Sequence, residues 1–86
     1  MKFKKNIALS DSGFIFDPTT GDSFNTNPVG LEIVQMLKQD NTPQEISAYF
    51  LKNYAVDEST FEKDLYDFIN MLSKFKLTEH NEKEKN

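Results

Sequence analysis

Two different spacings of hydrophobic residues divide the chain into a short N-terminal part and a longer C-terminal part. Up to Thr26 the apolar residues alternate with polar ones in short runs, and turn-forming residues separate the runs, which is typical of β-strands. From Pro28 onward the apolar residues recur every three or four positions, which is typical of amphipathic helices. We therefore predict an α+β domain in which a three-stranded antiparallel sheet is followed by three helices.

The turns between the predicted strands contain glycine and proline at positions that favour reversal of the chain. The strands themselves are expected over residues 6–10, 14–17 and 22–26. Asp11-Ser12-Gly13 is typical of a tight hairpin. Asp17 begins a second turn, in which Pro18 presets φ and Gly21 tolerates a positive φ. The third strand is expected to pair with the hairpin on one side, which leaves an edge with backbone donors and acceptors.

Each predicted helix follows a residue that can serve as its N-cap. Asn27 precedes a proline and can cap the first helix, while Thr42 and Glu45 have the spacing of a capping box for the second. The third helix has two candidate caps, Asp57 and Ser59. We expect the helices to end near Lys38, Tyr54 and Phe75. Helices two and three, joined by a short turn, resemble a helix-turn-helix.

The third predicted helix has a wider apolar arc than one buried face requires. Its core-facing stripe is expected to contain Phe61, Leu65, Phe68, Leu72 and Phe75. Ile69 lies on one flank of that stripe and Met71 on the other. The extra width can cover sheet and helices at once, or it can form the wall of a groove for a partner, and both interpretations stay open. With the third strand beside it, an extended peptide could add to the strand edge.

Composition and charge restrict the classes of partner. The chain has 86 residues, which is enough for one domain, and a net charge of −4 with no arginine at all. Nucleic-acid binding depends on Lys and Arg, so this balance argues against it, and a partner selected by charge should be basic. There is no cysteine, no apolar run long enough to span a membrane and no secretion signal. We expect a cytoplasmic protein that does not bind a membrane.

Few residues could carry chemistry. Asp64 and Asp67 are three positions apart on a helix and are explained as solvated charges, and His80 lies in an acidic segment with no second ligand nearby. The glycines are too widely spaced for a phosphate loop, although Gly30 indicates a close contact of the first helix. We expect no catalytic residue, no metal and no cofactor. The domain should cover residues 1–78, followed by a disordered polar tail over 79–86.

Motifs spread over almost the whole chain occur in a characteristic order. They are Ile7-Ala8, Gly13, Asp17-Pro18 to Gly21, Phe24 with Asn27, the Ile33 to Leu37 helix, Thr42-Pro43-Gln44-Glu45-Ile46, Tyr54-x-Val56-Asp57 and Asp64-Leu65-x-x-Phe68-Ile69-x-x-Leu72. Together they resemble the PqqD-like family. The resemblance implies a winged helix-turn-helix domain that recognises peptides destined to become modified natural products or cofactors such as pyrroloquinoline quinone. The glycine that commonly follows the last helix of the family is Lys76 here.

The resemblance also implies a binding site. A leader peptide would add as a strand to the third strand and lie in the groove between it and the third helix, often for delivery to a radical S-adenosylmethionine enzyme. Carried onto this chain, the peptide-binding residues are Ser23, Phe24, Asn25 and Thr26 of the strand and Asp64, Asp67, Phe68 and Met71 of the helix.

The resulting functional prediction is a non-catalytic peptide-binding adaptor. Its partners would be a precursor or leader peptide and a modifying enzyme, and the protein itself would be a monomer or a weak dimer. Two alternatives from other classes stay open. One is a winged-helix DNA-binding protein, suggested by the order of helices two and three, and the other is a structural or oligomerising module that uses the same strand edge.

Overall fold

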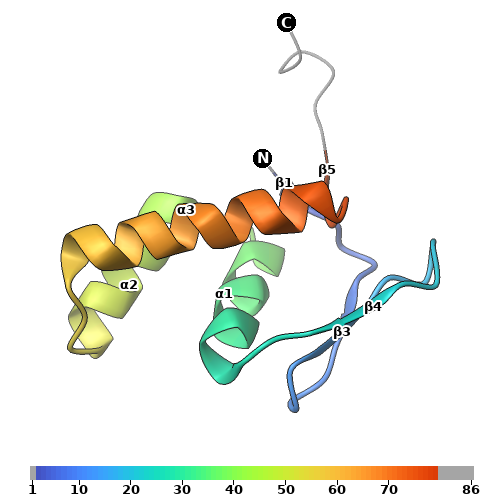
Figure 1. Ribbon diagram of the computed structural model, residues 1–86, viewed down its shortest axis with the longest axis horizontal. Coiled ribbons are helices and arrows are strands. Elements are labelled where there is room, and N and C mark those ends of the chain that lie inside the picture. Colours follow the sequence, from blue (N-terminus) through green and yellow to red (C-terminus); the bar gives the residue numbers. More distant parts are fainter. Residues whose placement is uncertain (1, 80–86) are drawn as a thin grey trace, which may run out of the picture.

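The computed structural model describes residues 2–79, which form two antiparallel sheets and three helices. The strands are β1 (Lys2–Phe3), β2 (Ala8–Leu9), β3 (Phe14–Phe16), β4 (Ser23–Asn25) and β5 (Thr78–Glu79), and the helices are α1 (Pro28–Lys38), α2 (Pro43–Asn53) and α3 (Glu58–Lys74). Figure 1 shows α3 running along one side of α1 and α2, with β3 and β4 near its C-terminal end. The expected α+β order of a three-stranded sheet followed by three helices is confirmed.

The larger sheet has the strand order β2-β3-β4 and is antiparallel throughout. Both of its turns contain a glycine with positive φ, namely Gly13 at 92° and Gly21 at 81°. Between β3 and β4 the buried Asp17 carboxylate accepts a hydrogen bond from the Thr19 amide at 2.9 Å. Asp17 is thus a turn former, as the sequence indicated, and its burial is matched by a hydrogen bond.

The smaller sheet pairs the beginning of the described chain with its end. Lys2 lies opposite Glu79 and Phe3 opposite Thr78, and Phe3 is almost completely buried. This sheet was not predicted, because a strand of two residues is too short to show a period. Glu79, assigned to the polar tail from sequence, is the last residue of β5. The rest of the predicted tail, residues 80–86 with His80, lies outside the described residues.

The three predicted N-caps are observed. Asn27 accepts from the Gly30 amide, and Thr42 and Glu45 form the reciprocal capping box. For α3 the structure selects Asp57, which accepts from the Thr60 amide at 3.0 Å. These caps satisfy amides that the first turn of a helix leaves without intrahelical partners, which explains why local sequence was sufficient to locate the helices.

The core stripe of α3 differs from the prediction. The helix buries Leu65, Ile69 and Leu72, while Phe61 and Phe68 are only partly buried. Ile69, expected on a flank, is 7% exposed, and Phe75, expected in the core, is 46% exposed. The reason is that α3 ends at Lys74, so Phe75 stands at the C-cap, and the core-facing line of the helix passes through Ile69 instead. Phe75 is thereby available to another surface.

Candidate functional site

One edge of the larger sheet belongs to β4, which pairs only with β3 among residues 2–79. Two backbone hydrogen bonds flank this pair of strands: the Asp17 amide donates to the Asp22 carbonyl at 2.9 Å, and the Thr26 amide donates to the Gly13 carbonyl at 2.8 Å. In an antiparallel ladder, hydrogen-bonded and non-hydrogen-bonded residue pairs alternate. These two bonds therefore determine which backbone groups of β4 point toward β3.

This alternation directs the backbone amide and carbonyl of Phe24 toward β3, and those of Ser23 and Asn25 away from it. Ile15 and Phe24 form the hydrogen-bonded pair between the two flanking ones, so the backbone groups of Phe24 point to β3. The amides and carbonyls of Ser23 and Asn25 consequently point to the free edge of β4. A further strand could pair with the sheet through these groups.

An apolar cavity of about 220 Å³ lies beside this edge, between β4 and the C-terminal part of α3. The side chains that line it are mostly apolar: Ile15, Phe24, Asn25, Thr26, Phe68, Met71, Leu72, Phe75 and Leu77. The rings of Phe24 and Phe75 lie 4.6 Å apart between centroids and close one side of the cavity. We refer to this cavity and the adjoining free edge of β4 as the β4–α3 groove.

The structure brings five of the eight residues expected in the peptide site together around this cavity. They are Phe24, Asn25, Thr26, Phe68 and Met71. Ser23 lies on β4 with its backbone directed to the free edge. Asp64 and Asp67 are exposed on α3 and do not line the cavity, although their spacing places them on the same face of the helix as Met71. Asp67 pairs with Lys63 at 3.1 Å. A role of all eight residues in peptide binding stays a prediction.

Phe75 and Leu77 were not predicted as lining residues, and the end of α3 explains why. Lys76 has a φ of 62°, its amide donates to the Ser73 carbonyl at 2.9 Å, and the Leu77 amide donates to the Leu72 carbonyl at 3.0 Å. This is the Schellman arrangement of a helix C-terminus. It turns the chain so that Leu77 reaches the groove. The sequence signal for this turn was Lys76, which occupies the position where the family commonly has glycine, a residue that adopts positive φ without strain.

A close contact with α1 positions the end of β4. A Cβ atom added to Gly30 would overlap the Thr26 hydroxyl and would lie 3.2 Å from the ring of Phe68. The absence of a side chain at Gly30 therefore lets α1, the end of β4 and α3 approach one another. This confirms the expectation of a close helix contact at Gly30, and it places two lining residues of the groove.

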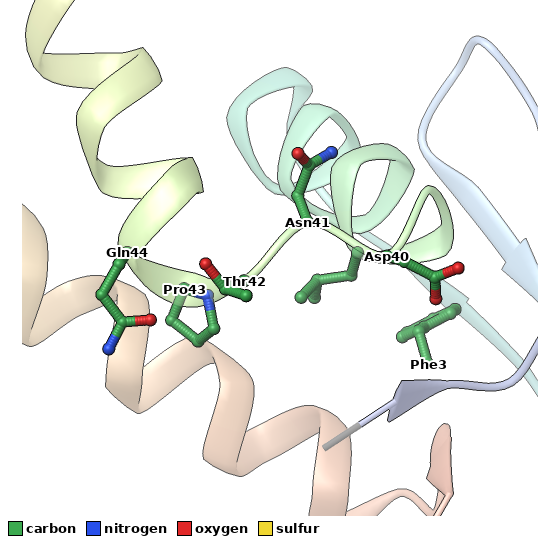
Figure 2. Close-up of a pocket in the computed structure, with 7 residues that line it drawn as sticks. Phe3, Asp40, Asn41, Thr42, Pro43 and Gln44 are labelled. Carbon is green, nitrogen blue, oxygen red and sulfur yellow. The ribbon is translucent and has the colours of Figure 1, made fainter.

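A second cavity, of about 240 Å³, lies beside the turn between α1 and α2 and is shown in Figure 2. Its lining is more polar, and several of the polar side chains already have partners. The Asn41 side chain donates to the Met36 carbonyl at 3.1 Å and points away from Phe3, while Thr42 belongs to the capping box of α2. Asn41 and Thr42 therefore serve the ends of the two helices, and Asp40 pairs with Lys5 at 2.9 Å.

The part of the chain that the structure describes, residues 2–79, has neither a metal-binding cluster nor a membrane-spanning helix. No group of three or more histidine, cysteine, aspartate and glutamate side chains in this part of the chain is arranged to hold a metal ion. None of the three helices is long and apolar enough to cross a membrane.

The fold and the groove define a class of protein: a small winged helix-turn-helix-like α+β domain with an apolar groove beside an open strand edge. Residues 13–77 match the family described as Coenzyme PQQ synthesis protein D (PqqD). The chain belongs to this family, and the resemblance noted from its motifs is confirmed.

Two solved structures are similar to this chain. "TbiB1 in Complex with the TbiA(beta) Leader Peptide" shares 30% sequence identity and a TM-score of 0.82, covering 94% of this chain and 98% of the other. "Lasso peptide synthetase B1 complexed with the leader peptide" shares 18% identity and a TM-score of 0.71, covering 85% and 89%. The second likeness supports the fold alone. No curated protein sequence matches the chain.

Proposed function

We propose that this protein is a non-catalytic adaptor that captures the leader of a precursor peptide as an additional strand on β4. The observation that carries the proposal is the position of the free edge. The outward backbone groups of Ser23 and Asn25 lie directly beside an apolar cavity, so one peptide could satisfy the edge and fill the cavity together. The other edge of this sheet belongs to β2, but the cavity adjoins β4.

The relatives support the proposal. TbiB1 is 30% identical over nearly the whole chain and was solved with a leader peptide. We further propose, from membership of the PqqD family, that the captured peptide is presented in the cytoplasm to a modifying enzyme, such as a radical S-adenosylmethionine enzyme. Asp64 and Asp67 extend the Met71 face of α3 beyond the cavity, and we assign them to a basic residue of the peptide.

Substitutions at Asn25 test strand addition. Asn25→Pro removes an outward amide, whereas Asn25→Ala keeps that amide and removes only the side chain. We expect the proline variant to bind a leader peptide encoded near the gene for this protein about tenfold more weakly than the alanine variant does, as loss of one backbone hydrogen bond implies. Isothermal titration calorimetry measures both affinities, and circular dichroism verifies that the variants are folded.

An NMR titration of the labelled wild-type protein with the same peptide locates the contact. Amide shifts should concentrate on β4 and on the C-terminal part of α3. Strand addition would be refuted by equal affinity of the proline and alanine variants, or by shifts scattered away from the β4–α3 groove.

A further inference from the structure

Large apolar side chains that remain exposed gather at a second place, far along α3 from the groove. Met71 and Phe75 belong to the groove, whereas four others surround the first turn of α1 and the last turn of α2: Val29, Tyr49, Tyr54 and Val56. A cavity of about 460 Å³ lies there, lined by Pro28, Val29, Glu32, Phe50, Tyr54, Ala55, Val56 and Phe61. We call it the α1–α2 pocket. It shares no lining residue with the groove.

The pocket contains one carboxylate in otherwise apolar and aromatic surroundings. Tyr49 Oη donates to Glu32 Oε2 at 2.8 Å, and Tyr54 Oη donates to Glu32 Oε1 at 3.0 Å. An ionised carboxylate has about four acceptor positions, so about two remain for another donor. No lysine among the described side chains forms an ion pair with Glu32. Among the described side chains, the negative charge of the pocket is therefore hydrogen-bonded but not neutralised by a cation.

The tyrosine hydroxyls stay protonated while they hold this carboxylate. The hydrogen bond to Glu32, with smaller contributions from desolvation and from the charge of Glu32, raises the pKa of Tyr49 to about 12. The same hydrogen bond raises the pKa of Tyr54. At neutral pH the tyrosines are hence donors without charge, and the carboxylate faces the pocket as its anionic group.

Aromatic rings form the walls next to the carboxylate. Phe50 stacks on Tyr54 with centroids 5.1 Å apart and on Phe61 with centroids 4.9 Å apart. Phe50 is buried in this stack, whereas Tyr54 is exposed and its ring can attract an organic cation. The apolar walls accommodate the aliphatic part of a lysine or arginine side chain. The combination of one unneutralised carboxylate, aromatic faces and a net charge of −4 favours a cationic occupant over an anionic or neutral one.

We propose that the α1–α2 pocket binds a lysine or arginine side chain of a partner protein, with its charged group on Glu32 and its aliphatic part against Val29 and Tyr54. Because the pocket and the groove are separate, a partner held here would leave the β4 edge accessible. The proposal does not depend on peptide capture at the groove, and each can fail without the other.

Two synthetic peptides that differ in one charge test the proposal. The probes are acetyl-Leu-Arg-Leu-amide and acetyl-Leu-citrulline-Leu-amide, because citrulline has the shape of arginine without its charge. In an NMR titration of the full chain, the arginine peptide should produce saturable shifts at Val29, Tyr54 and Val56 in the millimolar range. The citrulline peptide should bind about fivefold more weakly, as expected for a partly exposed charge pair.

Variants connect the binding to the carboxylate. Glu32→Gln keeps one oxygen that can accept a tyrosine hydrogen bond but loses the charge. It should weaken the binding of the arginine peptide about fivefold. Asp11→Asn makes the same change of net charge in the exposed β2–β3 turn and should leave its affinity unchanged. Tyr54→Leu, which removes one aromatic wall, should also weaken binding. Circular dichroism shows whether each variant is folded.

The proposal would be overturned by equal affinity for the two peptides, by shifts confined to the β4–α3 groove, or by no saturable shift at all. Equal weakening by Glu32→Gln and Asp11→Asn would do the same, because the effect would then come from net charge and not from the pocket. Repeating the titration in the presence of saturating leader peptide separates the two sites. Retained binding of the arginine peptide supports an independent pocket, and competition contradicts it.

Discussion

The β4–α3 groove and the α1–α2 pocket are both apolar hollows, but their polar groups differ in kind. The groove offers backbone amides and carbonyls at Ser23 and Asn25, which point away from the sheet. The pocket offers a side-chain carboxylate, Glu32, whose oxygens already accept from two tyrosines. Backbone groups are the same for every residue of an extended ligand, whereas a carboxylate selects for positive charge. We therefore expect the groove to recognise extended conformation and the pocket to recognise charge.

The largest expected effect comes from a substitution that disturbs the backbone supporting the β4–α3 groove and does not touch the α1–α2 pocket. A Cβ at Gly13 would overlap the Thr26 carbonyl, and φ is 92°, so Gly13→Ala combines overlap with strain. It should lower the free energy of unfolding by about 3 kcal/mol. Gly21→Ala is the matched control, because φ is 81° but nothing lies near its Cβ, and it should cost about 1 kcal/mol.

Urea denaturation measures the stability of both glycine variants. Equal losses for Gly13→Ala and Gly21→Ala would mean that the contact with Thr26 contributes nothing and that positive φ alone explains the cost.

Removal of the Phe75 ring should weaken ligand binding at the β4–α3 groove and leave binding at the α1–α2 pocket unchanged. Phe75→Ala takes away the side chain that packs on Phe24 and opens the groove, so leader-peptide affinity should fall about tenfold while binding of the arginine probe at the α1–α2 pocket is unchanged. Tyr66→Ala removes an aromatic side chain from α3 that does not line the groove, and it should affect neither. Calorimetry with each ligand measures the difference, and a parallel loss of both affinities would argue against separate sites.

The two ends of α3 can also be compared, since its C-terminus shapes the groove and its N-terminus adjoins the pocket. At the C-terminus, Lys76 has a φ of 62°, a conformation that glycine adopts without strain. Lys76→Gly should raise the free energy of unfolding by about 1 kcal/mol. Lys74→Gly makes the same exchange within the helix and should lower it by about 1 kcal/mol. Urea denaturation would contradict this account if both changes had the same sign.

The smallest expected effect is a pH dependence at the N-terminus of α3. Hydrogen bonds from the Thr60 amide, and from the hydroxyls of Thr60 and Ser59, lower the pKa of Asp57 below its ordinary value of 3.8. A lowered folded-state pKa stabilises the fold above the unfolded-state pKa, and this contribution is lost as the pH falls through the folded-state pKa.

Asp57→Asn tests this dependence, because asparagine also caps a helix but does not titrate. The stability difference between the wild type and this variant should be constant near neutral pH and should shrink below about pH 4. Urea denaturation across that range measures it, with Asp11→Asn as the control. A difference that does not change with pH would show that the charge of Asp57 does not contribute.

Local signals in the sequence located most of the fold. The capping residues Asn27, Thr42 and Asp57 mark the beginnings of the helices because they interact with amides two or three residues away. The turn glycines did the same for the larger sheet. The pairing of β1 with β5 could not be found in this way, because Phe3 and Thr78 are far apart in sequence and their strands are too short to show a pattern.

The groove was partly predictable. Phe24, Asn25, Thr26, Phe68 and Met71 were selected from the predicted strand, the width of the apolar arc and the family resemblance, and they line one cavity. The places of Phe75 and Leu77 depend on where α3 ends and how the chain turns after it. The α1–α2 pocket had no signal in the sequence, because Glu32 and Tyr54 meet only through the packing of α1 and α2.

The sequence by itself therefore determined the three helices, the three strands of the larger sheet, their order and the helix caps, since all of these depend on neighbours within a few residues. Tertiary structure alone decided which outward groups adjoin an apolar cavity. The reason is that β4 and α1 meet α3 through contacts between residues far apart in the sequence, such as the packing of Phe24 on Phe75 and the close approach of Gly30 to the ring of Phe68.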